Sequence, residues 1–222
     1  MDDRYTPLDF EQLTPEQQQL HHQIKTSRGL DPAQSLGGPF DPWIESPVLG
    51  GILSNLGYFH RFQSSLNRRQ IELAILVTAA HWQAAFEWWA HEPMARDAGL
   101  TESIIQAIKH RQPLRLSDPL DQMTWEIASA LQHNQRLTKE LYQRAVSGFG
   151  RPGVIELISL CGYYTTVAMT LNALEIPLPM GEACLLYTSD AADDSLRVDL
   201  GGRRIIKKSV FIFRGGSWSR VL

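Results

Sequence analysis

The sequence predicts an all-α fold, a compact bundle of about seven helices. Apolar residues recur at helical spacing through most of the first 183 residues. Capping residues, glycines and prolines interrupt these segments at short intervals, as they do between packed helices. We found no convincing strand pattern, so a sheet is not expected.

Composition narrows the class of protein. The chain has 222 residues, of which 43% are hydrophobic and 20% charged, values typical of one soluble globular domain. No apolar run reaches the length of a membrane span, and the polar N-terminus lacks the pattern of a signal peptide. The net charge of −3 disfavours a nucleic-acid surface. We therefore expect a cytoplasmic protein without membrane or nucleic-acid partners.

The first helix is expected after a lead-in of residues 1–13. Thr14 can cap it, Pro15 suits its first position, and Gln17 completes a capping box. This helix should run to about Ser27, so residues 1–37 form an N-terminal lead-in and helix. Residues 28–42 are rich in glycine and proline and predict a loop.

The main domain is expected to span residues 38–183. Its first helix should run over residues 43–62, with a kink near Pro47 and the Gly50-Gly51 pair. Asn67 and Gln70 form a second capping box ahead of a segment that is apolar on nearly every face, which predicts a buried helix. Further helices are predicted over residues 81–98, 101–110, 119–133, 138–147 and 152–174.

Glu72 is the one charged residue within the apolar stretch of residues 71–80. A buried carboxylate is costly unless it is paired, so its partner is expected to be Arg68, Arg69 or a histidine on the next helix. A salt bridge that only pins two helices would fit the same residues. A catalytic carboxylate is the alternative.

Glu87 and His91 lie four residues apart and share a helix face. A carboxylate beside an imidazole orients the ring and makes a plausible proton-transfer pair, although an ordinary helical contact has the same spacing. His81 lies off that face. The zinc-protease spacing is missing from the sequence, so we expect no metal and no cofactor.

An aromatic stripe accompanies these acids. Trp82, Phe86 and Trp89 recur at helical spacing, and Trp88 lies beside them. Such a stripe is most simply core or subunit interface. It could instead wall an apolar pocket, to which His81 would add a polar group.

Two further features have ordinary explanations. Gly148, Gly150 and Gly153 spell the dinucleotide-binding pattern, but they lie between predicted helices and indicate a turn. Cys161 falls on an apolar helix face and is expected to be a buried hydrophobe. Two cysteines also exclude a disulfide scaffold.

Residues 184–222 differ from the rest in composition and end in a basic segment. The segments Cys184–Asp193 and Val198–Lys208 resemble the translation of a sequencing-library adapter. The tail is therefore expected to be artefactual and to lack a domain of its own. A genuine basic tail that binds an acidic partner is the alternative.

Several segments together resemble the carboxymuconolactone decarboxylase family, which includes the alkylhydroperoxidase D proteins. They are Leu66–Leu73 (LNRRQIEL), Phe86–His91 (FEWWAH), Ala95–Leu100 (ARDAGL), Gly153–Leu157 (GVIEL), Tyr163-Tyr164, and Asn172 ahead of Ile176-Pro177. The resemblance implies an all-α fold that assembles into homotrimers or hexamers.

The resemblance also implies a site. The conserved glutamate and histidine of the hydroperoxidase branch fall on Glu72 and His91, and its two cysteines fall on Ala84 and Glu87. A dithiol peroxidase needs both thiols, so peroxidase activity is not expected of these residues. The decarboxylase branch needs none, and Glu72, Glu87 and His91 could supply its proton transfers.

The sequence therefore predicts a cofactor-free lyase that acts on a small lactone or carboxylic acid. Its catalytic residues would be Glu72, Glu87 and His91, and His91 would act as general acid or base. Two alternatives stay open: a peroxidase or peroxiredoxin activity typical of the family, and a homo-oligomer that binds a small ligand without catalysis.

Overall fold

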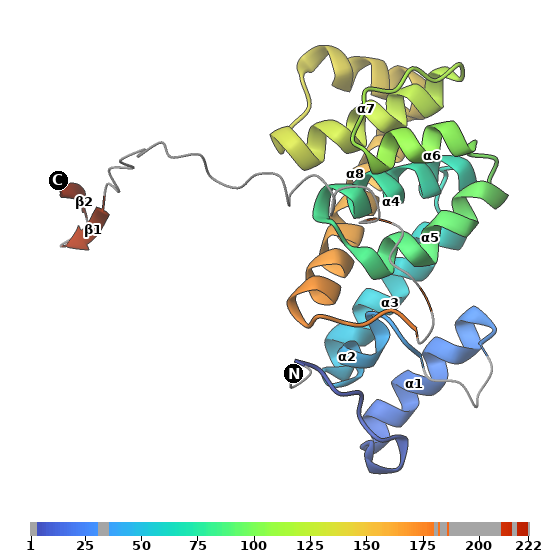
Figure 1. Ribbon diagram of the computed structural model, residues 1–222, viewed down its shortest axis with the longest axis vertical. Coiled ribbons are helices and arrows are strands. Elements are labelled where there is room, and N and C mark those ends of the chain that lie inside the picture. Colours follow the sequence, from blue (N-terminus) through green and yellow to red (C-terminus); the bar gives the residue numbers. More distant parts are fainter. Residues whose placement is uncertain are drawn as a thin grey trace, which may run out of the picture. The chain divides into compact units, whose positions relative to one another are not determined.

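The computed structural model describes residues 4–30 and 36–179, Glu182, Leu186, and the backbone of residues 210–214 and 217–221. The chain divides into two compact units, Met1–Thr188 and Ser189–Leu222. In the described part of the first unit, every regular element is a helix, which confirms the all-α prediction (Figure 1).

The described residues of the first unit form one 3-10 helix and eight α-helices. In chain order they are η1 (Phe10–Gln12), α1 (Pro15–Arg28), α2 (Phe40–Ile44), α3 (Pro47–Phe62), α4 (Arg68–Trp82), α5 (Ala85–Asp97), α6 (Glu102–Lys109), α7 (Pro119–Asn134) and α8 (Lys139–Ala173).

The second unit contains two strands that the sequence analysis did not predict. β1 (Val210–Arg214) pairs antiparallel with β2 (Ser217–Val221). Each strand carries β-branched or aromatic residues, and a Gly-Gly pair separates them, which is a hairpin signal. Most of the segments that resemble an adapter lie outside the described residues, so that interpretation stays a prediction.

Both predicted capping boxes are present. The Thr14 side chain accepts from the backbone of Gln17 and the Gln17 side chain accepts from the backbone of Thr14, which fixes the start of α1. Asn67 and Gln70 make the same reciprocal pair at the start of α4. Local sequence therefore sets where these two helices begin.

Four predicted helices are divided differently in the structure. The segment over residues 43–62 is two helices, because α2 ends at Ile44 and Pro47 begins α3. The segment over residues 81–98 is split, since α4 continues to Trp82 and Gln83 adopts a left-handed conformation before α5. The helices over residues 138–147 and 152–174 join as α8, with a sharp break at Gly150.

Helix α4 is the centre of the core and packs against α5, α7 and α8. Its residues from Gln70 to Ala80 are all buried, as the all-round apolar pattern predicts. Leu73, Ile75 and Leu76 are fully buried. The functional carboxylate candidate Glu72 therefore lies on a buried helix at the centre of the core.

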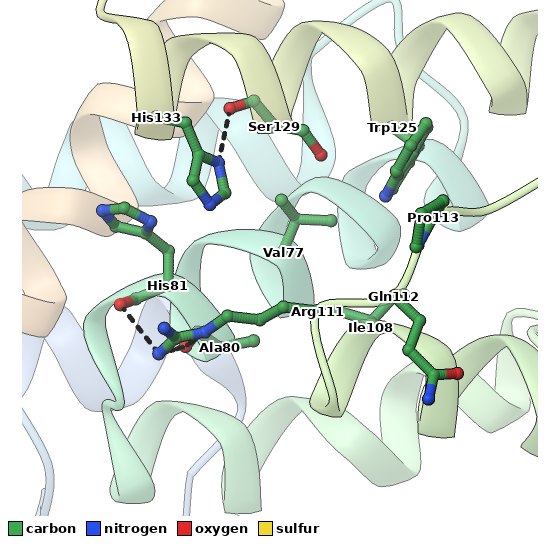
Figure 2. Close-up of a pocket in the computed structure, with 10 residues that line it drawn as sticks. All are labelled: Val77, Ala80, His81, Ile108, Arg111, Gln112, Pro113, Trp125, Ser129 and His133. Carbon is green, nitrogen blue, oxygen red and sulfur yellow. Dashed lines mark hydrogen bonds between the residues drawn. The ribbon is translucent and has the colours of Figure 1, made fainter.

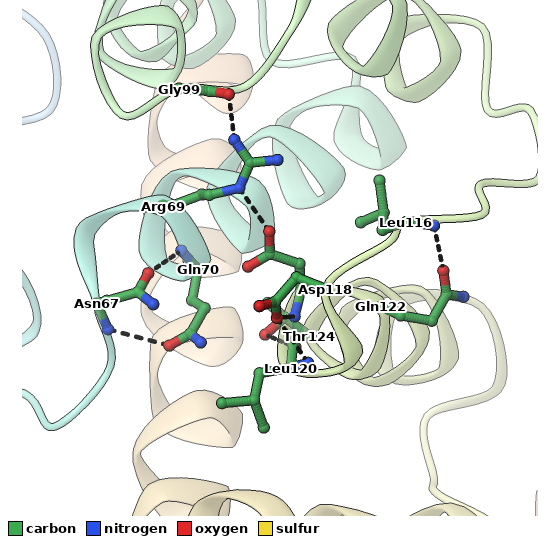
Figure 3. A network of polar contacts seen from close by, with 10 residues as sticks. Asn67, Arg69, Gln70, Gly99, Leu116, Asp118, Leu120, Gln122 and Thr124 are labelled. Carbon is green, nitrogen blue, oxygen red and sulfur yellow. Dashed lines mark hydrogen bonds and ion pairs between the residues drawn. The ribbon is translucent and has the colours of Figure 1, made fainter.

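A polar network near the start of α4 ties three elements together (Figure 3). Arg69 donates to the Asp121 carboxylate on α7 and to the Gly99 carbonyl that follows α5. Asp118 accepts from the backbone of Leu120 and Asp121 and so caps α7. Arg69 was one of three predicted partners for Glu72, and the structure pairs it with Asp121 instead.

Helix α8 is long and apolar enough to cross a membrane by length and composition, and it is the single such helix among the described residues. Half of its most apolar window is buried inside the protein, where it packs against α4 and α7. Core helices of a bundle have the same composition.

Candidate functional site

A cavity of about 420 Å³ lies between the N-terminal helices and the core helices. One side is formed by α1, the loop of residues 36–39 and α3, and the other by α5 and α8. Its volume falls in the range of small-molecule sites. Glu87 and His91 both line it, whereas Glu72 reaches it through His91.

Glu72 and His91 form a buried hydrogen-bonded pair across α4 and α5. The Nδ1 of His91 donates to Oε2 of Glu72 at 2.8 Å, which fixes the orientation of the imidazole ring. The ring also packs edge-on against Tyr164, with centroids 5.1 Å apart. Because Nδ1 is occupied, Nε2 is the ring nitrogen that can meet a molecule in the cavity.

Glu87 is 1% exposed, and neither of its carboxyl oxygens has a hydrogen-bond partner among the described residues. Burial raises the pKa of this carboxyl well above its ordinary range. Its position in the first turn of α5 favours a negative charge only weakly. A protonated carboxyl that faces a cavity is a proton donor.

Two arginines also line the cavity, and the sequence analysis named neither. Arg61 on α3 lies 3.9 Å from Glu72 Oε1 and donates to the Met94 sulfur. Arg28 lies over the ring of Phe40, 4.5 Å from its centroid. No local signal marks them, because they come from helices distant in sequence from α5.

The predicted aromatic stripe is divided among different surroundings. Phe86 and Trp89 line the cavity and pack edge-to-face. Trp88 is fully buried, and its indole donates to Glu92 at 2.9 Å. Trp82 is bound to Gln132 instead and lies by a different hollow near Asn172. Trp82 is separated from the others because α4 ends there and the chain turns at Gln83 before α5 begins. Trp88 faces away from the cavity because successive residues of a helix point about 100° apart.

His81 belongs to a separate small pocket of about 150 Å³ between α4, α7 and the segment after α6 (Figure 2). Its ring lies 4.8 Å from that of His133, whose Nδ1 donates to the Ser129 carbonyl. Arg111 donates to the backbone carbonyls of Ala80 and His81. The sequence analysis expected His81 and Trp82 to line the same pocket as Glu87 and His91. In the structure, neither of them lines the cavity of Glu87 and His91.

Within the part of the chain that the structure describes, no three His, Cys, Asp or Glu side chains cluster in a way that could hold a metal ion. Cys161 is buried, and burial raises the pKa of its thiol to about 12. Cys184 lies outside the described residues. Gly150 has a φ of 69° at the break in α8, which confirms the turn interpretation of the glycine pattern.

The chain shares its fold with three solved structures that we compared. The apo debrominase Bmp8 is 11% identical with a TM-score of 0.62, over 79% of this chain and 91% of that one. A variant of Bmp8 in complex with 2,3,4-tribromopyrrole is 12% identical, with the same coverage and a TM-score of 0.62. No protein-family model and no curated protein matches the sequence.

The third is an uncharacterized peroxidase-related protein from Silicibacter sp. TM1040. It is 12% identical with a TM-score of 0.62, over 81% of this chain and 94% of that chain. These likenesses show that the chain has the same fold as these proteins. At such low identity they show the fold alone, so the chemistry must be argued from the cavity.

Proposed function

We propose that this chain is a thiol-independent proton-transfer enzyme, and that it decarboxylates a small lactone or carboxylic acid. One observation carries the proposal: the unpartnered Glu87 carboxyl and the Glu72-held His91 line the same cavity. Two titratable groups in different environments are what acid–base catalysis requires. The fold neighbours include an enzyme, which agrees with a catalytic use of this fold.

Each group has a role in such a reaction. The bond between the substrate and its carboxylate carbon breaks, carbon dioxide leaves, and the electron pair enters an enolate. Glu87 delivers its proton to the enolate carbon, and the resulting carboxylate regains a proton from water. His91 stabilises the enolate oxygen, and the Glu72 carboxylate stabilises the positive charge of the imidazolium.

The surroundings suit this chemistry. Phe86, Trp89, Val167 and Leu171 give the cavity an apolar wall, which keeps water away from the enolate. The bound pyrrole named for the Bmp8 variant is a small aromatic ring, and an aromatic-lined cavity would suit a ligand of that kind.

A peroxidase is the weaker alternative. The one cysteine among the described residues, Cys161, is buried, and its raised pKa keeps it a thiol rather than a nucleophilic thiolate. No second thiol accompanies it in that part of the chain to resolve a sulfenic acid.

We also propose that copies of the chain associate into a homotrimer or hexamer. Large apolar side chains are exposed on α3 and α8, notably Val48, Ile52, Ile155 and Met169. Exposed apolar surface of this kind favours association. Light scattering of the purified chain measures the assembly.

The function is tested by assaying the full chain with carboxymuconolactone and related lactone acids, alongside an organic hydroperoxide with a dithiol. We expect lactone turnover that His91→Ala and Glu87→Gln abolish and that the exposed control His110→Ala leaves unchanged. Because Glu87 must be protonated, turnover should fall as pH rises through its raised pKa. Full lactone turnover by His91→Ala would end the proposal, and peroxide turnover would favour the alternative.

A further inference from the structure

Arg28 lines the cavity, and its guanidinium uses only some of its hydrogen-bond donors within the described protein. Its Nη1 donates to the hydroxyls of Ser27 and Ser54, both at 3.0 Å, and its Nη2 donates to the Ser54 carbonyl at 3.1 Å. A guanidinium has five N–H donors, so these contacts use three of them. The Nε–H and one Nη2–H, which form one edge of the fork, have no partner among the described residues.

No described carboxylate forms an ion pair with Arg28. Neither acid close to the cavity is a ready partner for Arg28, because Glu72 binds His91 and burial raises the pKa of Glu87, which disfavours its charged form. Arg61 adds a second positive charge, and its nearest described carboxylate oxygen is the other oxygen of Glu72, 3.9 Å away.

Positive charge is therefore in excess among the described side chains that line the cavity. The guanidiniums of Arg28 and Arg61 both line it, and Glu72 is the one described carboxylate that forms an ion pair with either of them. A partly buried guanidinium with no carboxylate partner among the described residues is costly, and burial together with Arg61 lowers the pKa of Arg28. A negative charge on a bound molecule would stabilise it.

We propose that Arg28 anchors a carboxylate of the ligand through the free edge of its guanidinium. The carboxylate is one that the substrate retains, at the end of the molecule away from the reacting carbon. Side-on pairing of a guanidinium with a carboxylate uses two parallel hydrogen bonds and fixes orientation as well as charge. That the anchored molecule is a substrate rests on the proposed function.

The positions of the side chains support separate roles for Arg28 in binding and for Glu87 and His91 in proton transfer. Arg28 comes from α1 on the N-terminal side of the cavity, whereas Glu87 and His91 come from α5 on the core side. Phe40, Phe86 and Trp89 provide apolar wall for the body of the ligand. The site thus fits a small aryl or alicyclic carboxylate, and Arg28 is its specificity-determining residue.

Two matched probes test the anchor without any turnover. Benzoate and benzamide have nearly the same shape, but only benzoate is charged at pH 7. We expect the full chain to bind benzoate more tightly than benzamide, as measured by calorimetry. Loss of a charge-assisted pair predicts that Arg28→Gln binds benzoate about tenfold to a hundredfold more weakly. Its benzamide binding should hardly change.

Two further variants distinguish a loss of carboxylate binding at Arg28 from a general loss of folding. Arg151→Gln removes an exposed arginine of α8 and should keep the benzoate preference. Arg28→Lys retains the charge but not the fork, so it should lose part of the preference, and it serves if Arg28→Gln fails to fold. Three results would each overturn the proposal. The unmodified chain could bind both probes equally, it could fail to bind benzoate at millimolar concentration, or the Arg28 variants could keep the benzoate preference.

The outcome is distinguishable from failure of the proposed function. Glu87→Gln should keep the benzoate preference because Glu87 is not the anchor. A preference that depends on Arg28, without turnover of any lactone acid, would leave the anchor standing and remove the decarboxylase. Lactone turnover without that preference would support the decarboxylase and overturn the proposed role of Arg28.

Discussion

Replacing Glu87 by glutamine should change how the stability of the fold depends on pH. Burial raises the pKa of the Glu87 carboxyl in the folded protein, whereas a glutamate in the unfolded chain titrates near about 4.3. Between these two values the folded protein retains a proton that the unfolded chain has released. The free energy of unfolding therefore falls as pH rises through that interval.

The size of the effect follows from one proton. The contribution of Glu87 to the unfolding free energy should decrease by about 1.4 kcal/mol per pH unit above the unfolded pKa, and level off above the folded pKa. Glutamine keeps the shape of the side chain and its unmade hydrogen bonds but does not titrate. The stability of Glu87→Gln relative to the unmodified protein should therefore grow with pH at that slope.

Equilibrium urea unfolding across about pH 5 to 8 measures this difference. Glu140→Gln is the matched control, because Glu140 also lies in the first turn of a helix but is exposed. A difference between Glu87→Gln and the unmodified protein that stays constant over the whole range would refute the reasoning. Glu87 would then be ionised or solvated in the folded protein, and its role as proton donor would fall with it.

Three further predictions follow from the structure. His60 is fully buried, and burial lowers its pKa. The unfolded histidine takes up a proton as pH falls from about 7 to 5, so the unfolding free energy should decrease over that range. Urea unfolding of His60→Gln should show less of this decrease. A Cβ on Gly57 would overlap the Tyr163 hydroxyl in the cavity, so Gly57→Ala should cost about 1–3 kcal/mol in urea unfolding and weaken benzoate binding. Removal of residues 184–222 should leave the melting temperature and lactone turnover unchanged; a loss of either would give the tail a role.

The sequence predicted the fold class and the helix starts because those signals are local. Capping boxes depend on residues three apart, and both were found where the sequence placed them. Helix ends were harder, since α4 passes His81 and stops at a left-handed Gln83, a conformation that the sequence does not mark. Strands β1 and β2 were missed although their Gly-Gly spacing is also a local signal.

The site was predictable only in part, because its members meet through packing. Four-residue spacing put Glu87 and His91 on one face, and both line the cavity. The partner of Glu72 could not be chosen, since Arg69 is nearer in sequence and turned out to bind Asp121. Arg28 is farther still in sequence from α5, and nothing in its own helix indicates that it lines the same cavity as Glu87 and His91.

The family resemblance is a prediction from the sequence alone, and it would place one of the two thiols of a dithiol peroxidase at Glu87. Glu87 lies in the first turn of α5. A thiol there would be activated as a nucleophile by the helix N-terminus. A carboxyl in the same apolar wall responds in the opposite sense, because burial raises its pKa and so favours the protonated form. The substitution would therefore exchange a nucleophile for a proton donor, while Glu72 and His91 keep their pairing.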